Sequence, residues 1–310
     1  MSSGCTLASV TEELKEQPSL LRSFSRREPR SKVEEEPVFV GAGDSYAASL
    51  CASFLAGPRV LALDPYSLAM SLDWAGGRPV YIISISGETT SNIELARALR
   101  GVSSRTTAIT SNPGSRLAST VDHIIDLRFR PRGKAPGIAS FTLSLAAALE
   151  VCGVDLAVDF EGAFSRAAKE AKRFRIARGG GVTHLTGNNE AYAASIYGMA
   201  KIYEFLGARA QTSLLEEFSH MPLFSLSNSD TVNVIESPSG VKGRLLYEKM
   251  KREGYPCSLI QPEGSRTERV YLLVFAMQMA AIDAARRRGL KAPYFLGAKK
   301  KLRISDEMIY

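Results

Sequence analysis

Residues 41–49 read Gly-Ala-Gly-Asp-Ser-Tyr-Ala-Ala-Ser, and residues 187–195 repeat this stretch in altered form as Gly-Asn-Asn-Glu-Ala-Tyr-Ala-Ala-Ser. The two stretches begin 146 residues apart, which is close to half of the 310-residue chain. Self-similarity at such a separation predicts one fold that is used twice.

The two copies differ where a phosphate-binding loop needs particular residues. The first copy has Gly43 and Ser45, where the second has Asn189 and Ala191. Glycine lets the backbone approach a phosphate closely, and a hydroxyl group can donate a hydrogen bond to it. We therefore expect the first half to bind phosphate and the second copy to serve folding and pairing.

Short apolar runs alternate with helical patterns through both halves. The run 37–41 ends in glycine and precedes a helical stretch over 45–55, for which Asp44 is the expected N-cap. Such alternation predicts an α/β fold of two tandem doubly wound parallel-sheet domains. The expected strands are 37–41, 60–63, 80–86, 106–110, 123–127, 182–186, 231–235 and 257–260, and the expected helices are 45–55, 89–99, 139–151, 159–175, 190–206 (ended by Gly207) and 267–288.

The predicted domains follow from this order. We expect an N-terminal helix and a charged connector over 1–36, a first domain over 37–155, and a second domain with the C-terminal tail over 156–310. Pro18 should break the leading helix, because proline removes a helix hydrogen bond. The charged run 26–36 is expected to be exposed.

The composition, with 45% hydrophobic and 23% charged residues, is typical of a soluble globular chain. The longest mostly apolar stretch, 270–285, is too short and too polar to span a membrane, and no secretory signal is present. A cytoplasmic protein without membrane contact is therefore expected. The cysteines and histidines lack metal-binding spacing, so neither a metal nor another cofactor is expected.

The net charge of +7 includes basic clusters at 22–30, 286–288 and 299–301. These clusters are scattered and mostly lack aromatic residues, unlike a nucleic-acid-binding surface. We interpret them as solvated surface and helix-end charges, and a small anionic substrate would suit the positive balance.

A second candidate loop is Ser84-Ile85-Ser86-Gly87-Glu88-Thr89, which follows the clearest predicted strand. Ligands of open α/β sheets bind beyond the carboxyl ends of strands. A phosphate could be bound here by the hydroxyl groups of Ser84, Ser86 and Thr89. Gly87 and the N-terminus of the following helix would add backbone N–H donors. The alternative interpretation is that these residues merely cap a helix. A third glycine of a dinucleotide fingerprint and a Walker A loop are both missing.

The segments 41–46 and 84–89 resemble the two phosphosugar loops of the SIS (sugar isomerase) domain family. Gly137–Ser140 resembles a third substrate-contacting segment and adds Ser140 to the candidate binding residues. Glu16–Pro18 is similar to the opening of the isomerase domain of glucosamine-6-phosphate synthase. The resemblance covers nearly the whole chain and implies a hexose-phosphate ligand.

Glu204 and His220 are the candidate proton-transferring residues. Glu204 lies among apolar residues of the helix 190–206, and apolar surroundings raise a carboxyl pKa toward the range useful for a base. The alternatives are a solvent-facing glutamate and a structural histidine. The resemblance implies that Glu204 moves a proton between C1 and C2 and that His220 helps to open the sugar ring. It also implies a homodimer, because the family's histidine commonly reaches a neighbouring subunit.

The segment 293–299 resembles a family C-terminal segment that ends in a substrate-contacting lysine. Lys299 matches best, with Lys300 and Lys301 next to it. Its role would be a Schiff base to the open-chain ketose or stabilisation of an enediolate. The alternative is a solvated basic tail.

The resemblance implies an aldose–ketose isomerase that converts glucose 6-phosphate or mannose 6-phosphate to fructose 6-phosphate, similar to the archaeal phosphoglucose/phosphomannose isomerases. Met221 stands where synthase-like members usually have glycine, which favours this version. A glucosamine-6-phosphate isomerase or deaminase and a non-catalytic sugar-phosphate sensor stay as alternatives, since the fold alone does not decide.

Overall fold

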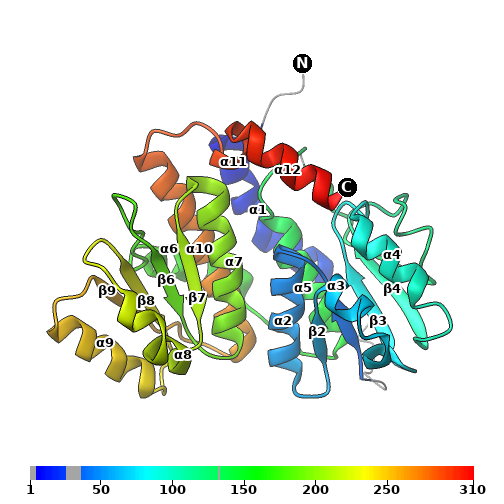
Figure 1. Cartoon of the computed structure of the whole chain (residues 1–310), viewed down its shortest axis with the longest axis horizontal. Helices are drawn as coiled ribbons and strands as arrows, with labels where there is room; N and C mark the ends of the chain where they lie inside the picture. Colours follow the sequence, from blue (N-terminus) through cyan, green and yellow to red (C-terminus); the bar gives the residue numbers. More distant parts are fainter. Residues whose placement is uncertain (1–4, 26–35, 132) are drawn as a thin grey trace. The chain divides into compact units, whose positions relative to one another are not determined.

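The computed structural model describes residues 5–25, 36–131 and 133–310, and it divides into two compact units. The first unit comprises residues 15–157 and 298–310. The second comprises residues 158–297 and the chain up to Leu14. Each unit contains its own parallel sheet flanked by helices (Figure 1). The predicted α/β class with two doubly wound parallel sheets is confirmed.

The sheet of the first unit has the strand order β2-β1-β3-β4-β5, and each neighbouring pair is parallel. Its central strands are apolar and fully buried, as expected when helices cover both faces. Helices α2 and α5 pack against each other. The elements are β1 Val38–Val40, α2 Asp44–Ala56, β2 Leu61–Leu63, α3 Pro65–Ala69, η1 Leu72–Ala75, β3 Pro79–Ile83, α4 Thr90–Ala98, β4 Arg105–Thr110, β5 His123–Asp126, α5 Ala139–Val151 and α12 Lys299–Ile309.

The sheet of the second unit has the order β7-β6-β8-β9, again with parallel pairs. Helix α10 packs along both α6 and α7. Gly207 ends α7 in the left-handed conformation, as predicted. The elements are α6 Phe160–Ala171, β6 Thr183–Thr186, α7 Glu190–Leu206, β7 Ala210–Ser213, α8 Leu215–His220, η2 Pro222–Ser225, β8 Thr231–Ile235, α9 Lys242–Arg252, β9 Cys257–Ile260, α10 Arg266–Arg287 and α11 Tyr294–Gly297.

Two predictions about helix ends are wrong. Helix α1, Leu7–Ser25, continues through Pro18. The residues Leu14 and Leu21 on either side of Pro18 are buried, and their packing outweighs the proline cost of about 3 kcal/mol. At the first loop, Gly43 rather than Asp44 is the N-cap, and Asp44 is the first helical residue.

The C-terminal tail also differs from expectation. It was expected to belong with the second domain, but residues 298–310 group with the first unit. Most of the charged run 26–36 lies outside the described residues. No helix in the described ranges is long and apolar enough to cross a membrane.

Candidate functional site

Two of the predicted loops leave the first unit's sheet at the same edge. Strands β1 and β3 are parallel neighbours with Val40 opposite Ile82, so Gly41–Ser45 and Ser84–Thr89 follow adjacent strand ends. Each loop leads into a helix N-terminus, where backbone N–H groups and the helix dipole attract anions. The first turn of α2 contains Asp44, whereas that of α4 contains no acidic residue. The start of α4 is therefore the better anion site.

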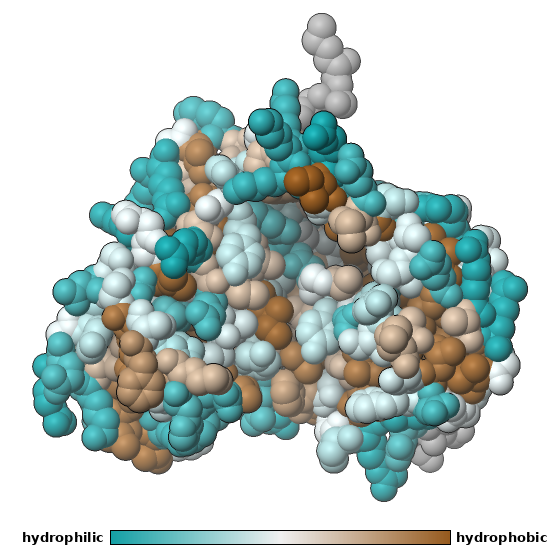
Figure 2. All heavy atoms as spheres, in the orientation of Figure 1, coloured by the Kyte–Doolittle hydropathy of each residue, from teal (hydrophilic) through white to brown (hydrophobic). Residues whose placement is uncertain are grey.

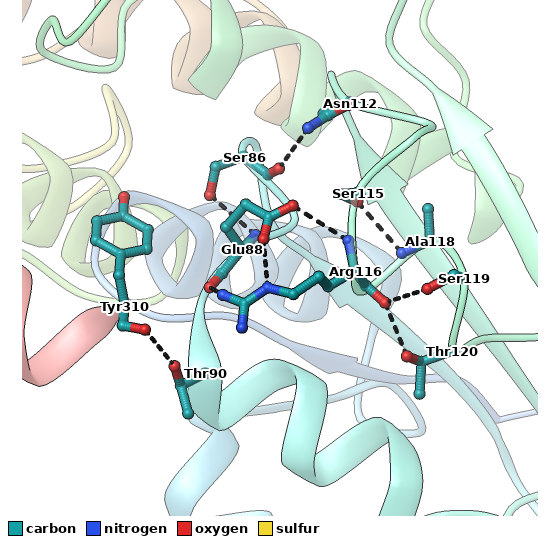
Figure 3. A network of polar contacts seen from close by, with 10 residues as sticks. All are labelled: Ser86, Glu88, Thr90, Asn112, Ser115, Arg116, Ala118, Ser119, Thr120 and Tyr310. Carbon is teal, nitrogen blue, oxygen red and sulfur yellow. Dashed lines mark hydrogen bonds and ion pairs between the residues drawn. The ribbon is translucent and has the colours of Figure 1, made fainter.

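The Ser84–Thr89 loop is held in one conformation by its neighbours (Figure 3). The Ser86 hydroxyl accepts a hydrogen bond from the Glu88 backbone N–H at 3.2 Å, and Asn112 donates to the Ser86 carbonyl at 3.1 Å. Gly87 has φ +65°, and a Cβ there would lie 2.0 Å from the Ser115 hydroxyl. The loop thus needs glycine both for its backbone angle and for its packing.

Thr89 is the N-cap residue of α4, but its side chain makes no capping hydrogen bond. The interpretation of this hydroxyl as an ordinary helix cap is therefore wrong. Its hydroxyl group is left for another acceptor, such as a phosphate oxygen.

Glu88 and Arg116 form an ion pair beside this loop (Figure 3). Arg116 Nε lies 2.5 Å from Glu88 Oε2, and Arg116 Nη2 donates to the Glu88 carbonyl at 2.9 Å. The hydrogen bond from Arg116 lowers the pKa of Glu88, so this carboxylate stays ionised and paired. The positive charge of Arg116 offsets the carboxylate charge that would otherwise repel a phosphate. The sequence motif gave no signal for Arg116, because it comes from the loop after a different strand.

The third predicted segment lies against the first. A Cβ at Gly137 would be 2.4 Å from Asp44 Oδ2, so the Gly137–Ser140 segment contacts the start of α2. Gly43 has open space around its α-carbon, which leaves its backbone accessible. The predicted binding residues of the first unit thus lie at the loop ends of one sheet; they are Gly43, Ser45, Ser84, Ser86, Gly87, Thr89 and Ser140.

In the second unit, Glu204 lies on α7 with its side chain about one third exposed. Its Oε2 atom is 2.5 Å from Nζ of Lys201, which is fully buried. The Lys201 ammonium also lies 4.8 Å from the centre of the Tyr197 ring, and the Tyr197 hydroxyl accepts a hydrogen bond from Gln278 at 2.7 Å. Besides the apolar residues beside it in the sequence, Glu204 therefore has a charged neighbour, Lys201.

Lys201 is the functional candidate that the sequence interpretation missed. A signal was available, because residues three apart lie on the same face of a helix. Burying a charge is costly unless it is paired, so a buried ammonium next to a candidate catalytic carboxylate points to a functional arrangement.

His220 is the last residue of α8 and is exposed, with 71% of its side chain accessible. Its Nε2 atom lies 3.4 Å from Glu216 Oε1, and Glu216 also pairs with Lys242. Exposed apolar residues accompany it, Met221 at 60% and Phe224 at 84%. Figure 2 shows apolar atoms (brown) at the surface where Figure 1 places α8 and α9. His220 is thus accessible from solvent.

Lys299 is the first residue of α12, in the first unit, whereas Glu204 and His220 belong to the second. Lys299 is exposed, as are Lys300 and Lys301. The contacts of α12 and of Tyr310 directly after it include an ion pair between Asp306 and Lys134 and a hydrogen bond from the Thr90 hydroxyl to the Tyr310 carbonyl at 3.0 Å (Figure 3). The tail therefore ends at the first turn after the Ser84–Thr89 loop.

No protein-family model matches the sequence, and no curated protein matches it. Solved structures do resemble it. Glucosamine-6-phosphate deaminase from Thermotoga maritima is 19% identical with a TM-score of 0.72, covering 91% of this chain and 95% of that one. Tagatose-6-phosphate ketose/aldose isomerase from Escherichia coli is 16% identical with a TM-score of 0.72, covering 91% and 93%.

A third similar structure is the C-terminal domain of glucosamine-fructose-6-phosphate aminotransferase from Francisella tularensis. It is 15% identical with a TM-score of 0.69, and the match covers 92% of this chain and 97% of that one. At sequence identities this low, the likeness shows a shared fold and nothing about the reaction. The chain therefore has the tandem α/β fold found in these three phosphosugar proteins.

Proposed function

We propose that this protein is a sugar-phosphate isomerase of the SIS type that interconverts an aldose and a ketose hexose 6-phosphate. The observation that carries the proposal is the Lys201–Glu204 pair, in which a fully buried ammonium holds a half-buried carboxylate. A protein that only binds sugar phosphate has no need of such a pair, which is expensive to bury. The fold shared with sugar-phosphate enzymes adds support.

In the proposed mechanism, the hydroxyl groups of Ser84, Ser86 and Thr89 bind the phosphate together with backbone N–H groups at the start of α4. His220 assists ring opening, and the Glu204 carboxylate then removes the C2 proton and returns it to C1. Lys201 positions that carboxylate. The Lys299 ammonium stabilises the negative charge of the enediolate.

We further propose glucose 6-phosphate or mannose 6-phosphate and fructose 6-phosphate as the substrate pair, and a cytoplasmic homodimer as the working form. The exposed position of His220, next to Met221 and Phe224, supports a contribution of this residue to a neighbouring chain. A glucosamine-6-phosphate isomerase or deaminase is the second candidate, because one of the similar structures is a glucosamine-6-phosphate deaminase and another is a domain of a glucosamine-fructose-6-phosphate aminotransferase.

The test is to incubate the purified protein with glucose 6-phosphate, mannose 6-phosphate or glucosamine 6-phosphate in D₂O and to follow the products by NMR. The proposal expects fructose 6-phosphate from a neutral sugar, with solvent deuterium entering at the exchanging carbon. Ammonium release would select the deaminase instead. Binding of all three sugars without turnover would identify a sensor and overturn the proposal.

The matched variants are Glu204→Gln and Glu190→Gln, which make the same change on the same helix. Glu204→Gln should abolish deuterium exchange while sugar binding persists. Glu190→Gln should keep exchange. Equal activity in the two variants would remove Glu204 from the role of base.

A further inference from the structure

We propose that the second unit contains a binding site for the diphosphate or triphosphate group of a small molecule, at the amino-terminal edge of its sheet. A cavity of about 1350 Å³ lies there. Its lining includes the residues just before the strands: Gly181 before β6, Arg209 before β7, Asp230 before β8 and Pro256 before β9. The proposal does not depend on the isomerase assignment, because none of the candidate catalytic or phosphate-binding residues is among the residues that line this cavity.

Positive charge dominates the cavity lining. Two carboxylates are present, and both are engaged elsewhere. Asp283 lies 3.4 Å from Arg286, and Asp230 accepts hydrogen bonds from the backbone N–H groups of Val182 and Ser227 at 2.6 and 2.8 Å. The cationic lining residues are Lys172, Arg175, Arg178, Arg209, Arg287 and Arg288.

Helix ends explain only part of this charge. Helices α6, α7 and α10 all end at this edge, and cations near helix C-termini interact favourably with the helix dipole. That effect accounts for Lys172, Arg287 and Arg288. Arg175 and Arg178 lie in the loop beyond α6, past the last turn where the dipole acts. The helix dipole therefore does not explain why Arg175, Arg178 and Arg209 line one cavity, whereas binding of an anionic ligand does.

Two of the guanidinium groups are held in place without being neutralised. Arg209 Nη1 donates to the Gly180 carbonyl at 3.1 Å, and Arg288 Nη2 donates to the Ala177 carbonyl at 3.2 Å. A neutral carbonyl fixes the orientation of a guanidinium but does not cancel its charge. The remaining N–H groups keep the planar arrangement that binds phosphate oxygens in pairs.

The glycine run Gly179-Gly180-Gly181 lines the same cavity; the Gly181 N–H donates to the Arg178 carbonyl at 3.2 Å, so the backbone donors of the run that face a ligand are those of Gly179 and Gly180. Gly179 has φ +61° and Gly180 has φ +87°, and no atom lies within 4 Å of where a Cβ would be at either position. Successive N–H groups in such turns form a concave anion-binding surface. At Gly181, a Cβ would lie 2.0 Å from the Ser229 carbonyl, so the loop is packed firmly at its end.

The number of cations and the size of the cavity favour a polyphosphate group over a single phosphate. At neutral pH one phosphate carries at most two negative charges, which is fewer than the net positive charge of a lining with six cations and two carboxylates. The lining also includes Phe174 and Pro256, which offer apolar surface to a base or another organic group. A phosphate chain occurs both in inorganic triphosphate and in a nucleoside triphosphate, so both are candidate ligands of the site.

Isothermal titration calorimetry on the full chain at constant ionic strength tests the site with three probes: sodium triphosphate, ATP and sodium phosphate. We expect triphosphate or ATP to bind at least about tenfold more tightly than phosphate. Tighter binding of ATP than of triphosphate would identify a nucleotide site. Equal binding would identify the phosphate chain as the recognised group.

The test variant is Arg178→Glu/Arg287→Glu, and the matched control is Lys249→Glu/Arg252→Glu, which changes the net charge equally at exposed positions of α9 outside the cavity. The test variant should lose about tenfold or more in affinity, and the control about twofold or less. Circular dichroism checks folding, and the milder Arg178→Gln serves if the double variant unfolds.

Three results would overturn the proposal. These are no binding of either polyphosphate to the unmodified protein, equal losses in the test and control variants, and, in an additional titration with a single-stranded oligonucleotide, tighter binding of the oligonucleotide than of ATP. The last result would assign the surface to nucleic acid.

Discussion

Gly43 and Asn189 adopt the same backbone conformation in the two units. Gly43 has φ +58° and ψ −123°, and Asn189 has φ +51° and ψ −126°. Equivalent hydrogen bonds follow in the next helix turn: Ser49 Oγ donates to the Ser45 carbonyl at 2.9 Å, and Ser195 Oγ donates to the Ala191 carbonyl at 2.7 Å. The second loop therefore keeps the geometry of the first without its glycine.

Replacement of Asn189 by glycine should stabilise the protein. An L-residue at positive φ costs about 1–2 kcal/mol, and glycine removes this cost while adding some entropy to the unfolded chain. We expect a net gain of up to about 1 kcal/mol in the free energy of unfolding, measured by urea denaturation. The control is Asn228→Gly in a loop with ordinary φ, which should not stabilise. A loss of stability in Asn189→Gly would show that the asparagine side chain matters more than its backbone strain.

The Lys201–Glu204 pair should respond unequally to the loss of its two members. Glu204→Leu leaves a fully buried ammonium without its carboxylate and should cost about 3–5 kcal/mol, whereas Lys201→Met leaves a carboxylate that solvent can reach. The double variant should recover part of the loss. A double-mutant cycle by urea denaturation measures this coupling. Equal, additive losses would contradict the pairing.

The hydroxyl groups of the Ser84–Thr89 loop should matter for binding more than for folding. Ser86→Ala and Thr89→Ala should each weaken fructose 6-phosphate binding by about tenfold, the value of one hydrogen bond to a charged group. Titration calorimetry measures the affinity. Ser119→Ala is the matched control, because this exposed hydroxyl donates to the Arg116 carbonyl in the neighbouring loop. Unchanged affinity in the loop variants would place the phosphate elsewhere.

Glu190 should make stability depend on pH in the acid range. Burial alone would raise the pKa of Glu190, but hydrogen bonds from Arg266 at 2.8 and 3.2 Å outweigh this effect and lower it. A lowered folded-state pKa means that the stabilisation is complete above the ordinary glutamate pKa of about 4.3 and is lost as the pH falls through the folded-state value.

The comparison is with Glu190→Gln. At pH 7 the unmodified protein should be more stable by about 1–3 kcal/mol, and the difference should shrink below about pH 4. Urea denaturation between pH 7 and pH 3 follows it. A difference that stays constant over this range would show that ionisation of Glu190 has no part in it.

The order of strands and helices could be predicted because local signals mark it. Glu190–Leu206 has helical spacing and a glycine directly after it, and the structure has this helix with the same bounds. Residues 80–83 are apolar, as a strand buried on both faces must be, and β3 ends at Ile83, three residues before the predicted end at Ser86. The loops at the strand ends followed from the parallel arrangement, since such loops collect at one edge.

Features that depend on tertiary contacts could not be predicted. Pro18 is accommodated inside α1 because Leu14 and Leu21, on either side of it, are buried. The short strand β7, Ala210–Ser213, has little apolar character and belongs to the sheet through its pairing with β6. Arg116 is brought to Glu88 by the fold alone. Lys201 is different, because its spacing from Glu204 was visible in the sequence.

The bond between Thr90 and Tyr310 has a practical consequence for anyone producing this protein. The Tyr310 carbonyl accepts its hydrogen bond from Thr90, the residue that directly follows the Ser84–Thr89 loop. Any group attached at Tyr310 would lie beside that loop, so binding and activity measurements should be made on protein without a fusion at this position.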